Sequence, residues 1–473
     1  MLSSKGVHSY QHRATFISTI GIQVCTISGP FRRTSLSMTQ WYEGLHTLLR
    51  LGVIGAIHDS AERYPPPNCH PDTRKAVRQI ILDWIHSENS ASFFFWLYGP
   101  AGAGKTAILQ AIAELLCSPS ESDQSFGGSF FFSRGKKGRD QGHLLFSTIA
   151  YQLALKVPGL RQHVNRIMEI DPALPMKSMG IQLQTLIVDA FRCLSPLPQR
   201  SYLVIIDGLD ECHDKATQQL ILQLLCETIT VHKLPLRFLI GSRPESQIRD
   251  SFDQESLYKI TRRVVLDETF NPGRDIRVFL QDGFAKMCTK NPILSRVEQP
   301  WPGEGVIDLL VQRSSGQFIY AATVLKFVGA DFCSPTKQLA LILKPDPTAF
   351  SDLDQLYTQI LSVYPSSVNI VQILGIIIAF DEMNLPEVIE DIFGMEEGRL
   401  ELVLQGLSSL MKEENLNTGV NSYVISHFAH ASFSDYLFDS TRSGSFHVNQ
   451  QEYDEMVTIQ SFTLITQLIR SWR

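Results

Sequence analysis

A glycine-rich octapeptide in the first quarter of the chain constrains the fold more than any other feature. It reads G-x-x-x-x-G-K-T, and its residues are Gly99, Pro100, Ala101, Gly102, Ala103, Gly104, Lys105 and Thr106. An apolar run at 93–98 precedes it, and a helical pattern at 105–117 follows it. A phosphate-binding loop requires this order, because the loop N–H groups and the helix N-terminus then face one anion. We predict that the octapeptide binds a nucleotide, with Lys105 at the β- and γ-phosphates and the Thr106 hydroxyl on Mg²⁺.

A second apolar run, 202–207, ends in acidic residues. An acid at the end of such a strand completes a nucleotide site, so Asp207 is predicted to hold Mg²⁺ through water. Asp210 and Glu211 are candidates for orienting the attacking water. The alternative for these two acids is a solvated helix cap before Lys215.

A third apolar run, 236–242, is followed by Arg243. In a parallel sheet this arginine would lie beside the phosphate loop, where it could sense the γ-phosphate. We place it with Asp210 and Glu211 among the candidate catalytic residues. Its alternative is a surface ion pair with Glu245.

Short apolar runs alternate with helical patterns through this part of the chain. The predicted strands are 93–98, 129–133, 202–207 and 236–242, and the predicted helices are 105–117, 142–155, 215–229 and 260–266. Alternation of this kind indicates a parallel sheet covered by helices on both faces. The predicted fold class is therefore α/β, a P-loop NTPase three-layer αβα sandwich.

Helical patterns take over after residue 270, the clearest being 275–287, 306–327, 353–363, 371–379, 386–393 and 400–410. A strand-like run at 422–426 follows them. Helices followed by a hairpin-like pair predict a small helical domain and then a winged-helix domain.

These patterns divide the chain into five parts. We predict a largely disordered N-terminal extension (1–69), a nucleotide-binding core (70–270), the small helical domain (271–345), the winged helix (346–445) and the truncated start of a further helical segment (446–473).

Charge and composition bear on partners and compartment. The net charge is −6, with 42 basic and 48 acidic residues, and residues 346–442 hold 15 acids against three bases. Because phosphates repel such a surface, we predict that DNA is not a partner. No apolar run approaches the roughly 20 residues of a membrane span, and the eight cysteines are scattered. We expect a cytoplasmic protein without membrane insertion.

Taken together, the loop, the acidic strand and the arginine strand resemble the NACHT branch of the STAND P-loop ATPases, especially the nephrocystin-type fungal proteins. Further matching motifs lie at 69–74, 275–280, 316–321, 353–361 and 430–436. The resemblance covers residues from about 70 to 445, with order and spacing kept.

The resemblance implies a signalling switch, as in fungal self/non-self recognition. ADP closes such proteins, and exchange for ATP opens them for homo-oligomer assembly. His430 matches the winged-helix histidine that reaches the β-phosphate of ADP, although a buried core histidine is the alternative. Relatives place Gly-x-Pro against adenine where this chain has Phe318, so Phe318 is a candidate for stacking on the base, and the choice between ATP and GTP stays open.

From the resemblance we also expect slow hydrolysis of the nucleotide. We further expect protein effectors that bind through flanking domains absent here. The alternatives are a P-loop ATPase or kinase that is not a switch, and a truncated nucleotide-binding remnant.

Overall fold

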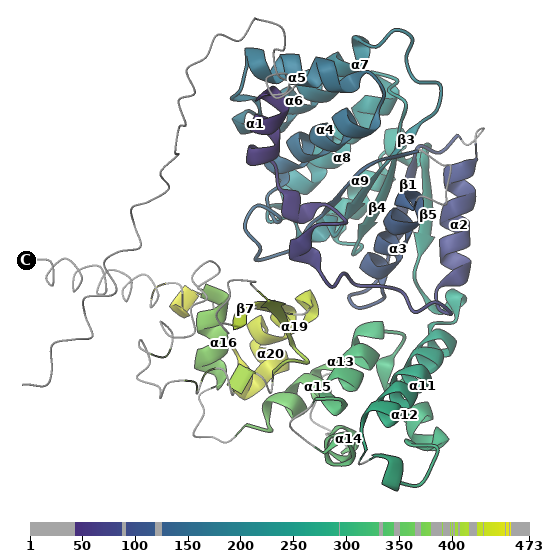
Figure 1. Ribbon diagram of the computed structural model, residues 1–473, viewed down its shortest axis with the longest axis vertical. Coiled ribbons are helices and arrows are strands. Elements are labelled where there is room, and N and C mark those ends of the chain that lie inside the picture. The colour runs from purple at the N-terminus through teal and green to yellow at the C-terminus, as the bar shows by residue number, and fades with distance from the viewer. Residues whose placement is uncertain are drawn as a thin grey trace, which may run out of the picture. The chain divides into compact units, whose positions relative to one another are not determined.

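The computed structural model describes residues 43–344, apart from 88–90, 119–124, 293 and 331–333. It also describes 351–364, 370–379, 407–415, 423–428, 430–449 and a few single positions up to 455. Within the described residues, the main sheet has five strands in the order β2-β3-β4-β1-β5. Figure 1 labels four of them, β3, β4, β1 and β5. They are β1 (Phe94–Tyr98), β2 (Phe126–Phe131), β3 (Tyr202–Asp207), β4 (Leu236–Ser242) and β5 (Thr261–Val265). Every neighbouring pair is parallel. The predicted α/β class is confirmed.

One strand differs from its prediction. Residues 260–266 were expected to form a helix, but 261–265 form β5 and pair with β1. The β-branched residues Thr261, Val264 and Val265 favour a strand, and pairing with β1 outweighs the helical spacing of the apolar positions.

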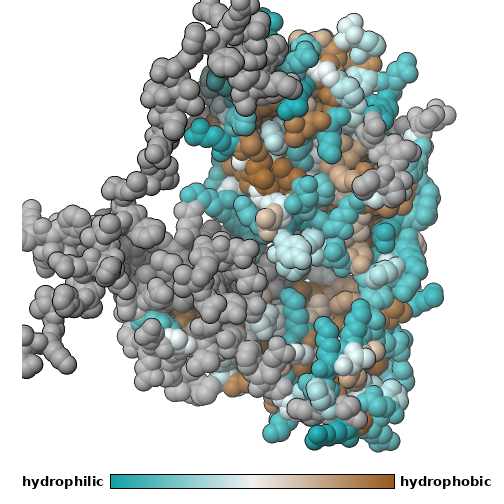
Figure 2. All heavy atoms as spheres, in the orientation of Figure 1, coloured by the Kyte–Doolittle hydropathy of each residue, from teal (hydrophilic) through white to brown (hydrophobic). Residues whose placement is uncertain are grey.

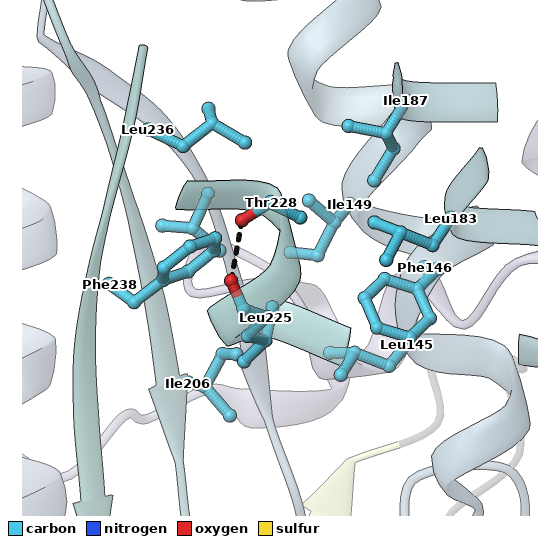
Figure 3. Close-up of a pocket in the computed structure, with 11 residues that line it drawn as sticks. Leu145, Phe146, Ile149, Leu183, Ile187, Ile206, Leu225, Thr228, Leu236 and Phe238 are labelled. Carbon is cyan, nitrogen blue, oxygen red and sulfur yellow. Dashed lines mark hydrogen bonds between the residues drawn. The ribbon is translucent and has the colours of Figure 1, made fainter. Parts of the chain in front are cut away.

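Helices cover both faces of the sheet, because successive strand residues point to opposite sides. On one face, α2 (Lys75–His86) and α3 (Lys105–Cys117) pack on side chains such as Phe95, Ile205 and Leu239. On the other face, Val204, Ile206 and Phe238 lie among side chains of α4 (Leu145–Lys156), the π-helix η6 (Leu183–Asp189) and α8 (Lys215–Thr230), as Figure 3 shows in part. The void between them measures about 10 Å³, the lower limit for one water molecule. It is part of a packed core.

Shorter helices complete this part of the chain. They are α5 (Leu160–Ile170), α6 (Met179–Gln182), α7 (Ala190–Arg192), α9 (Ser246–Asp253) and α10 (Glu255–Tyr258). Among the described residues, no helix has the length and apolar character needed to cross a bilayer.

The segment before the predicted core has regular structure from residue 43 on. It forms α1 (Glu43–Leu51) and the short 3-10 helices Ile54–Ala56 and Ala61–Arg63. Leu45 and Leu48 are buried, with α1 packed against α4 and α5. The expectation of a largely disordered extension over 1–69 therefore does not hold for 43–69, because an apolar stripe of only three turns was enough to bind this segment to the core.

The edge strand β2 is closed by a side chain. The amide of Gln152, in α4, accepts a hydrogen bond from Ser129 N (2.9 Å) and donates one to Ser129 O (2.8 Å). These are the two backbone groups that a further strand would otherwise bind. Gln152 is only 6% exposed, so its amide takes the place of a neighbouring peptide.

A helical region follows the sheet, formed by α11 (Pro272–Lys290), α12 (Glu304–Ser314), α13 (Phe318–Val328), α14 (Pro335–Leu343) and α15 (Asp352–Leu361). The single helix predicted over 306–327 is two helices. It breaks at Ser315 and Gly316, whose φ angles of 45° and 77° are left-handed. On the face seen in Figure 2, mostly hydrophilic residues cover α11 and α12, as expected for helices that pack on a core by one side.

The last described elements are α16 (Ile370–Ala379), the antiparallel pair β6 (Met411–Asn415) and β7 (Tyr423–Phe428), α19 (Ala431–Phe438) and α20 (Ser440–Ser443). One hydrophobic core runs from Ile276 in α11 to Val448 beyond α20, across the predicted boundary at 345. The predicted helix at 386–393 lies almost entirely outside the described residues. Of the segment predicted for 446–473, the part after residue 455 also lies outside them. The winged helix thus stays a prediction.

Candidate functional site

The glycine-rich loop connects β1 to α3. Gly102 and Gly104 have φ angles of +72° and +91°, a region that L-residues rarely adopt. The Lys105 ammonium donates to the carbonyls of Gly99 and Pro100, both at 2.9 Å. The loop thus encloses the Lys105 ammonium, and this burial lowers the pKa of the lysine.

Two residues from outside the sheet hold this loop. A Cβ on Gly102 would lie 2.2 Å from Cγ2 of Ile319, in α13. The guanidinium of Arg74 donates to Ala103 O at 2.8 Å, and its Cζ lies 4.8 Å from the ring centroid of Phe318. Phe318, predicted to stack on a base, thus contacts Arg74 beside the loop. Arg74 was missed, although it belongs to one of the matching motifs (69–74).

The acid at the end of β3 fits a magnesium site. Asp207 is 3% exposed, and its Oδ1 has no hydrogen-bond partner. Burial raises the pKa of Asp207 to about 6, while a hydrogen bond from the Thr106 side chain lowers it. A buried carboxylate oxygen without a partner, beside a hydroxyl, is a donor set that Mg²⁺ prefers. Asp207 and Thr106 therefore fit the ion that the sequence predicted for them.

The second acidic pair forms the short helix η7 (Leu209–Glu211). Burial, with the charge of Asp210 second, raises the pKa of Glu211 to about 7. The cap of α8 is Asp214, whose side chain accepts from the N–H groups of Ala216 and Thr217. Asp210 and Glu211 are therefore not the helix cap that was their alternative.

Arg243 follows β4 and pairs with two acids. Its backbone N donates to Asp210 Oδ1 at 2.9 Å, and its Nε lies 3.2 Å from Asp210 Oδ2. One terminal nitrogen donates to Asp435 Oδ2, in α19, at 2.6 Å. Burial lowers the pKa of Arg243, but Asp435 and Asp210 outweigh burial and raise it. These ion pairs, rather than the alternative one with Glu245, occupy the arginine.

His430 precedes α19 and caps it. Its Nδ1 accepts from Ser432 N at 3.0 Å. Burial, with the cations of Arg243 and Lys105 next, lowers the pKa of His430 to about 4. The ring is therefore neutral near pH 7, and its electrostatic neighbours belong to the phosphate loop and to the end of β4.

The structure gathers most of the predicted residues into one cluster at the carboxyl ends of β1, β3 and β4. Its predicted members are Lys105, Thr106, Asp207, Asp210, Glu211, Arg243 and His430. Two charged residues of the cluster were missed, Arg134 after β2 and Asp435 in α19. The matching motif at 430–436 contains Asp435, but only His430 was given a role.

Comparisons with known proteins bear on the nucleotide core. Residues 77–243 match the family described as Nephrocystin 3, N-terminal. No curated protein sequence matches the chain.

Several solved structures are distantly similar. One is Drosophila ORC bound to DNA, with 13% identity, 87% of this chain and 96% of that chain covered, and a TM-score of 0.34. Another is the Aeropyrum pernix ORC1 protein in complex with DNA, with 15% identity, coverage of 74% and 87%, and a TM-score of 0.35. A third is Cdc6p from Pyrobaculum aerophilum, with 13% identity, coverage of 79% and 94%, and a TM-score of 0.36.

One prediction about partners is wrong. DNA is present in two of these similar structures, which contradicts its exclusion from the acidic charge of residues 346–442. A net charge sums over every face of a domain, so it does not describe the potential of any one surface.

The remaining findings converge on the nucleotide core. The octapeptide lies between a buried parallel strand and a helix, the acid of β3 lies beside it, and the family match covers both. These findings support a P-loop nucleotide-binding site within residues 77–243.

Proposed function

We propose that the protein is a nucleotide-dependent switch that binds ATP and ADP with Mg²⁺ and responds to the terminal phosphate. GTP remains an alternative to ATP. The observation that carries this proposal is the contact between α19 and the nucleotide core, made by the ion pair of Arg243 with Asp435 and by His430 near Lys105.

Phosphate binding follows from the loop. Its N–H groups and the N-terminus of α3 supply partial positive charge, and Lys105 adds a full one. The ammonium donates to Gly99 O and Pro100 O, and these bonds would be exchanged for bonds to phosphate oxygens. Burial lowers the pKa of Lys105 and so disfavours its charged form. A bound phosphate would stabilise that charged form.

Asp207 and Thr106 would hold Mg²⁺, which neutralises phosphate charge when it is bound. The Asp207 carboxyl must be ionised for this role. Its pKa of about 6 leaves it mostly ionised at pH 7.

Slow hydrolysis would rely on Glu211 more than on Asp210. Both carboxylate oxygens of Asp210 are engaged by Arg243, so Asp210 positions the arginine. Glu211, with a pKa of about 7, is poised to accept a proton from water near neutral pH. A switch needs a long-lived state, so we expect turnover well below that of metabolic kinases, about 1–100 per second.

The segment 346–445 would act as the lid, as a winged helix does in the STAND switches that the chain resembles. His430 would contact ADP in the closed arrangement, and loss of this contact would release the lid. Only contacts that differ between two arrangements can shift their populations. Homo-oligomer assembly, protein effectors and a cytoplasmic role in signalling are parts of the same proposal.

The first test is binding. Labelled ATP and ADP are titrated with Mg²⁺ against wild type, Lys105→Ala and Lys259→Ala, an exposed lysine in a surface ion pair with Glu255. We expect Lys105→Ala alone to lose affinity. Equal affinities in all three proteins would contradict the phosphate site.

The second test separates a switch from its alternatives. Turnover at kinase rates would favour an ordinary P-loop enzyme, and binding without any nucleotide-dependent change in assembly would favour a remnant.

A further inference from the structure

The carboxylate of Asp435 is shared between two arginines of the nucleotide core. Its Oδ1 lies 3.0 Å from a terminal nitrogen of Arg134, and its Oδ2 lies 2.6 Å from one of Arg243. Each oxygen thus receives one guanidinium. The side chains of Asp435 and Arg243 are 20% and 19% exposed, so this anion is bound in a partly desolvated place where charge interactions are strengthened.

The two arginines are anchored without help from α19. Arg134 donates its backbone N–H to Glu211 Oε2 (3.1 Å), and a terminal nitrogen lies 3.4 Å from Asp210 O. Arg243 is fixed on the Asp210 carboxylate. Both guanidinium groups therefore belong to the wall of the nucleotide site, next to the proposed water-positioning acid.

Asp435, in contrast, is anchored on the C-terminal side. In α19, Ser432 and Tyr436 hydrogen-bond through their hydroxyls to Tyr357 and Thr358 of α15, each at 2.8 Å. The aspartate is therefore attached to α15 and α19, whereas its arginines, which follow β2 and β4, are attached to η7.

We infer that Asp435 occupies the place of an anion that the nucleotide also supplies, and that Arg134 is a second ligand of the terminal phosphate beside Arg243. This inference rests on the proposed nucleotide switch. Paired guanidinium groups match phosphate oxygens as well as carboxylate oxygens. ATP carries the competing terminal phosphate and ADP lacks it, so ATP displaces Asp435 while ADP leaves it in place.

The inference assigns Asp435 a different part from His430. His430 would favour ADP by an added contact, while Asp435 would disfavour ATP by occupying the arginines that ATP needs. The ratio of the dissociation constants for ADP and for a non-hydrolysable ATP analogue measures this competition directly.

The experiment measures that ratio with Mg²⁺ in the full chain. Asp435→Asn keeps the size of the side chain and removes its charge. Because a hydrogen bond to a charged group contributes about 1.5–3 kcal/mol, we expect the ratio to rise about 10- to 100-fold in favour of the ATP analogue. Asp308→Asn is the matched control, an exposed acid paired with Arg277 on the surface, and it should leave the ratio unchanged.

Arg134→Gln supplies an independent arm. Its side chain is 47% exposed, so its loss should not unfold the protein. We expect weaker binding of the ATP analogue, about tenfold or more, with ADP binding unchanged. Combining Arg134→Gln with Asp435→Asn should cancel part of the gain that Asp435→Asn gives alone.

The outcomes separate the two proposals. If Lys105→Ala binds like wild type, the nucleotide site itself is wrong. If binding depends on Lys105 but neither Asp435→Asn nor Arg134→Gln changes the ratio, the proposed competition between Asp435 and ATP is wrong and the switch proposal stands. Equal changes in the affinities for ADP and for the ATP analogue would also overturn the competition, because they would show a structural effect on the whole site.

Discussion

His430 Nδ1 accepts the backbone N–H of Ser432 at 3.0 Å. In the neutral ring the proton therefore lies on Nε2, which leaves Nε2–H as a donor for an anion. This arrangement gives the predicted lid contact a defined chemistry, because a neutral imidazole can donate to a phosphate oxygen without carrying a buried charge.

Replacing His430 by Leu should therefore weaken the closed arrangement by about 1.5–3 kcal/mol, the range for a hydrogen bond to a charged group. Light scattering with ADP and with a non-hydrolysable ATP analogue measures the effect. Wild type should stay monomeric in ADP, and the variant should assemble more readily. As a control, wild type must first be shown to change its assembly with nucleotide. If it does, and the variant in ADP stays as closed as wild type, His430 is a core histidine.

Nucleotide binding with Mg²⁺ should depend on pH through Asp207. Its pKa is raised from 3.8 to about 6 in the folded protein, so below pH 6 the carboxyl must release a proton to hold Mg²⁺. Affinity should fall as pH falls from 7 to 5, with proton release detected by calorimetry in buffers of different ionisation enthalpy. Asp207→Asn should bind more weakly and lose this part of the proton release.

The raised pKa of Asp207 also determines how the free energy of unfolding changes with pH when no ligand is bound. Between pH 3.8 and 6 the folded state binds more protons at Asp207 than the unfolded state does, so this residue makes the free energy of unfolding fall as pH rises. His430, lowered from 6.5 to about 4, acts in the opposite direction and makes it rise between pH 4 and 6.5. Urea denaturation of Asp207→Asn and His430→Leu across pH 4–7 should change the slope in opposite senses.

Hydrolysis should depend on Glu211 as a base. Glu211→Gln should lower the single-turnover rate about 10²- to 10⁴-fold, the usual contribution of a general base, while ATP affinity holds. Asp210→Asn should also slow hydrolysis, but together with a loss of ATP affinity, because Asp210 positions Arg243. A normal rate in Glu211→Gln would remove Glu211 from the chemistry.

Two loop glycines offer a matched pair. A Cβ at Gly102 would meet Ile319 at 2.2 Å, whereas a Cβ at Gly104 has nothing within 4 Å. Both positions have positive φ, so each alanine costs about 1 kcal/mol of backbone strain, but only Gly102→Ala adds a clash with α13. Urea denaturation should find Gly102→Ala less stable by a further 1–3 kcal/mol, roughly the cost of overpacking. Equal losses would show that α13 yields easily.

The Arg442 and Asp354 pair should be important for folding of the C-terminal part. Asp354 is 1% exposed and accepts two hydrogen bonds from Arg442, at 3.2 and 2.6 Å. Arg442→Met leaves that carboxylate buried without its cation, at a cost of about 3–5 kcal/mol. The control Arg277→Met breaks exposed pairs and should cost about 1 kcal/mol or less, both measured by chemical denaturation.

The nucleotide core was the part most open to prediction. A phosphate loop needs a fixed local order of strand, glycines and helix, so Lys105, Thr106 and the class of the sheet could be read from residues close together in sequence. Strand β5 was missed because its identity depends on pairing with β1, which lies more than 160 positions earlier in the chain.

The residues that sequence reasoning missed depend on distant contacts. Arg134 and Asp435 are 301 positions apart, and neither belongs to a phosphate-loop motif. The break at Ser315 and Gly316 was locally visible as a glycine, but an apolar pattern on both sides concealed it. The apolar pattern of residues 43–51 covers few helical turns, so it was too weak to predict that this segment packs on α4 and α5.

The amide of Gln152 has a consequence for solubility. A parallel sheet ends in an edge whose free N–H and C=O groups can recruit a strand from another molecule. Gln152 satisfies the backbone pair of Ser129, and the backbone N–H of His58 donates to the Ser129 hydroxyl at 3.0 Å. The strand is thus contacted by α4 and by the segment before the core. A chain cut at residue 70, where the folded core was first expected to begin, would lose the second contact and present part of β2 to its neighbours. We therefore expect a chain that begins at residue 70 to associate through this edge more readily than a chain that keeps residues 43–69.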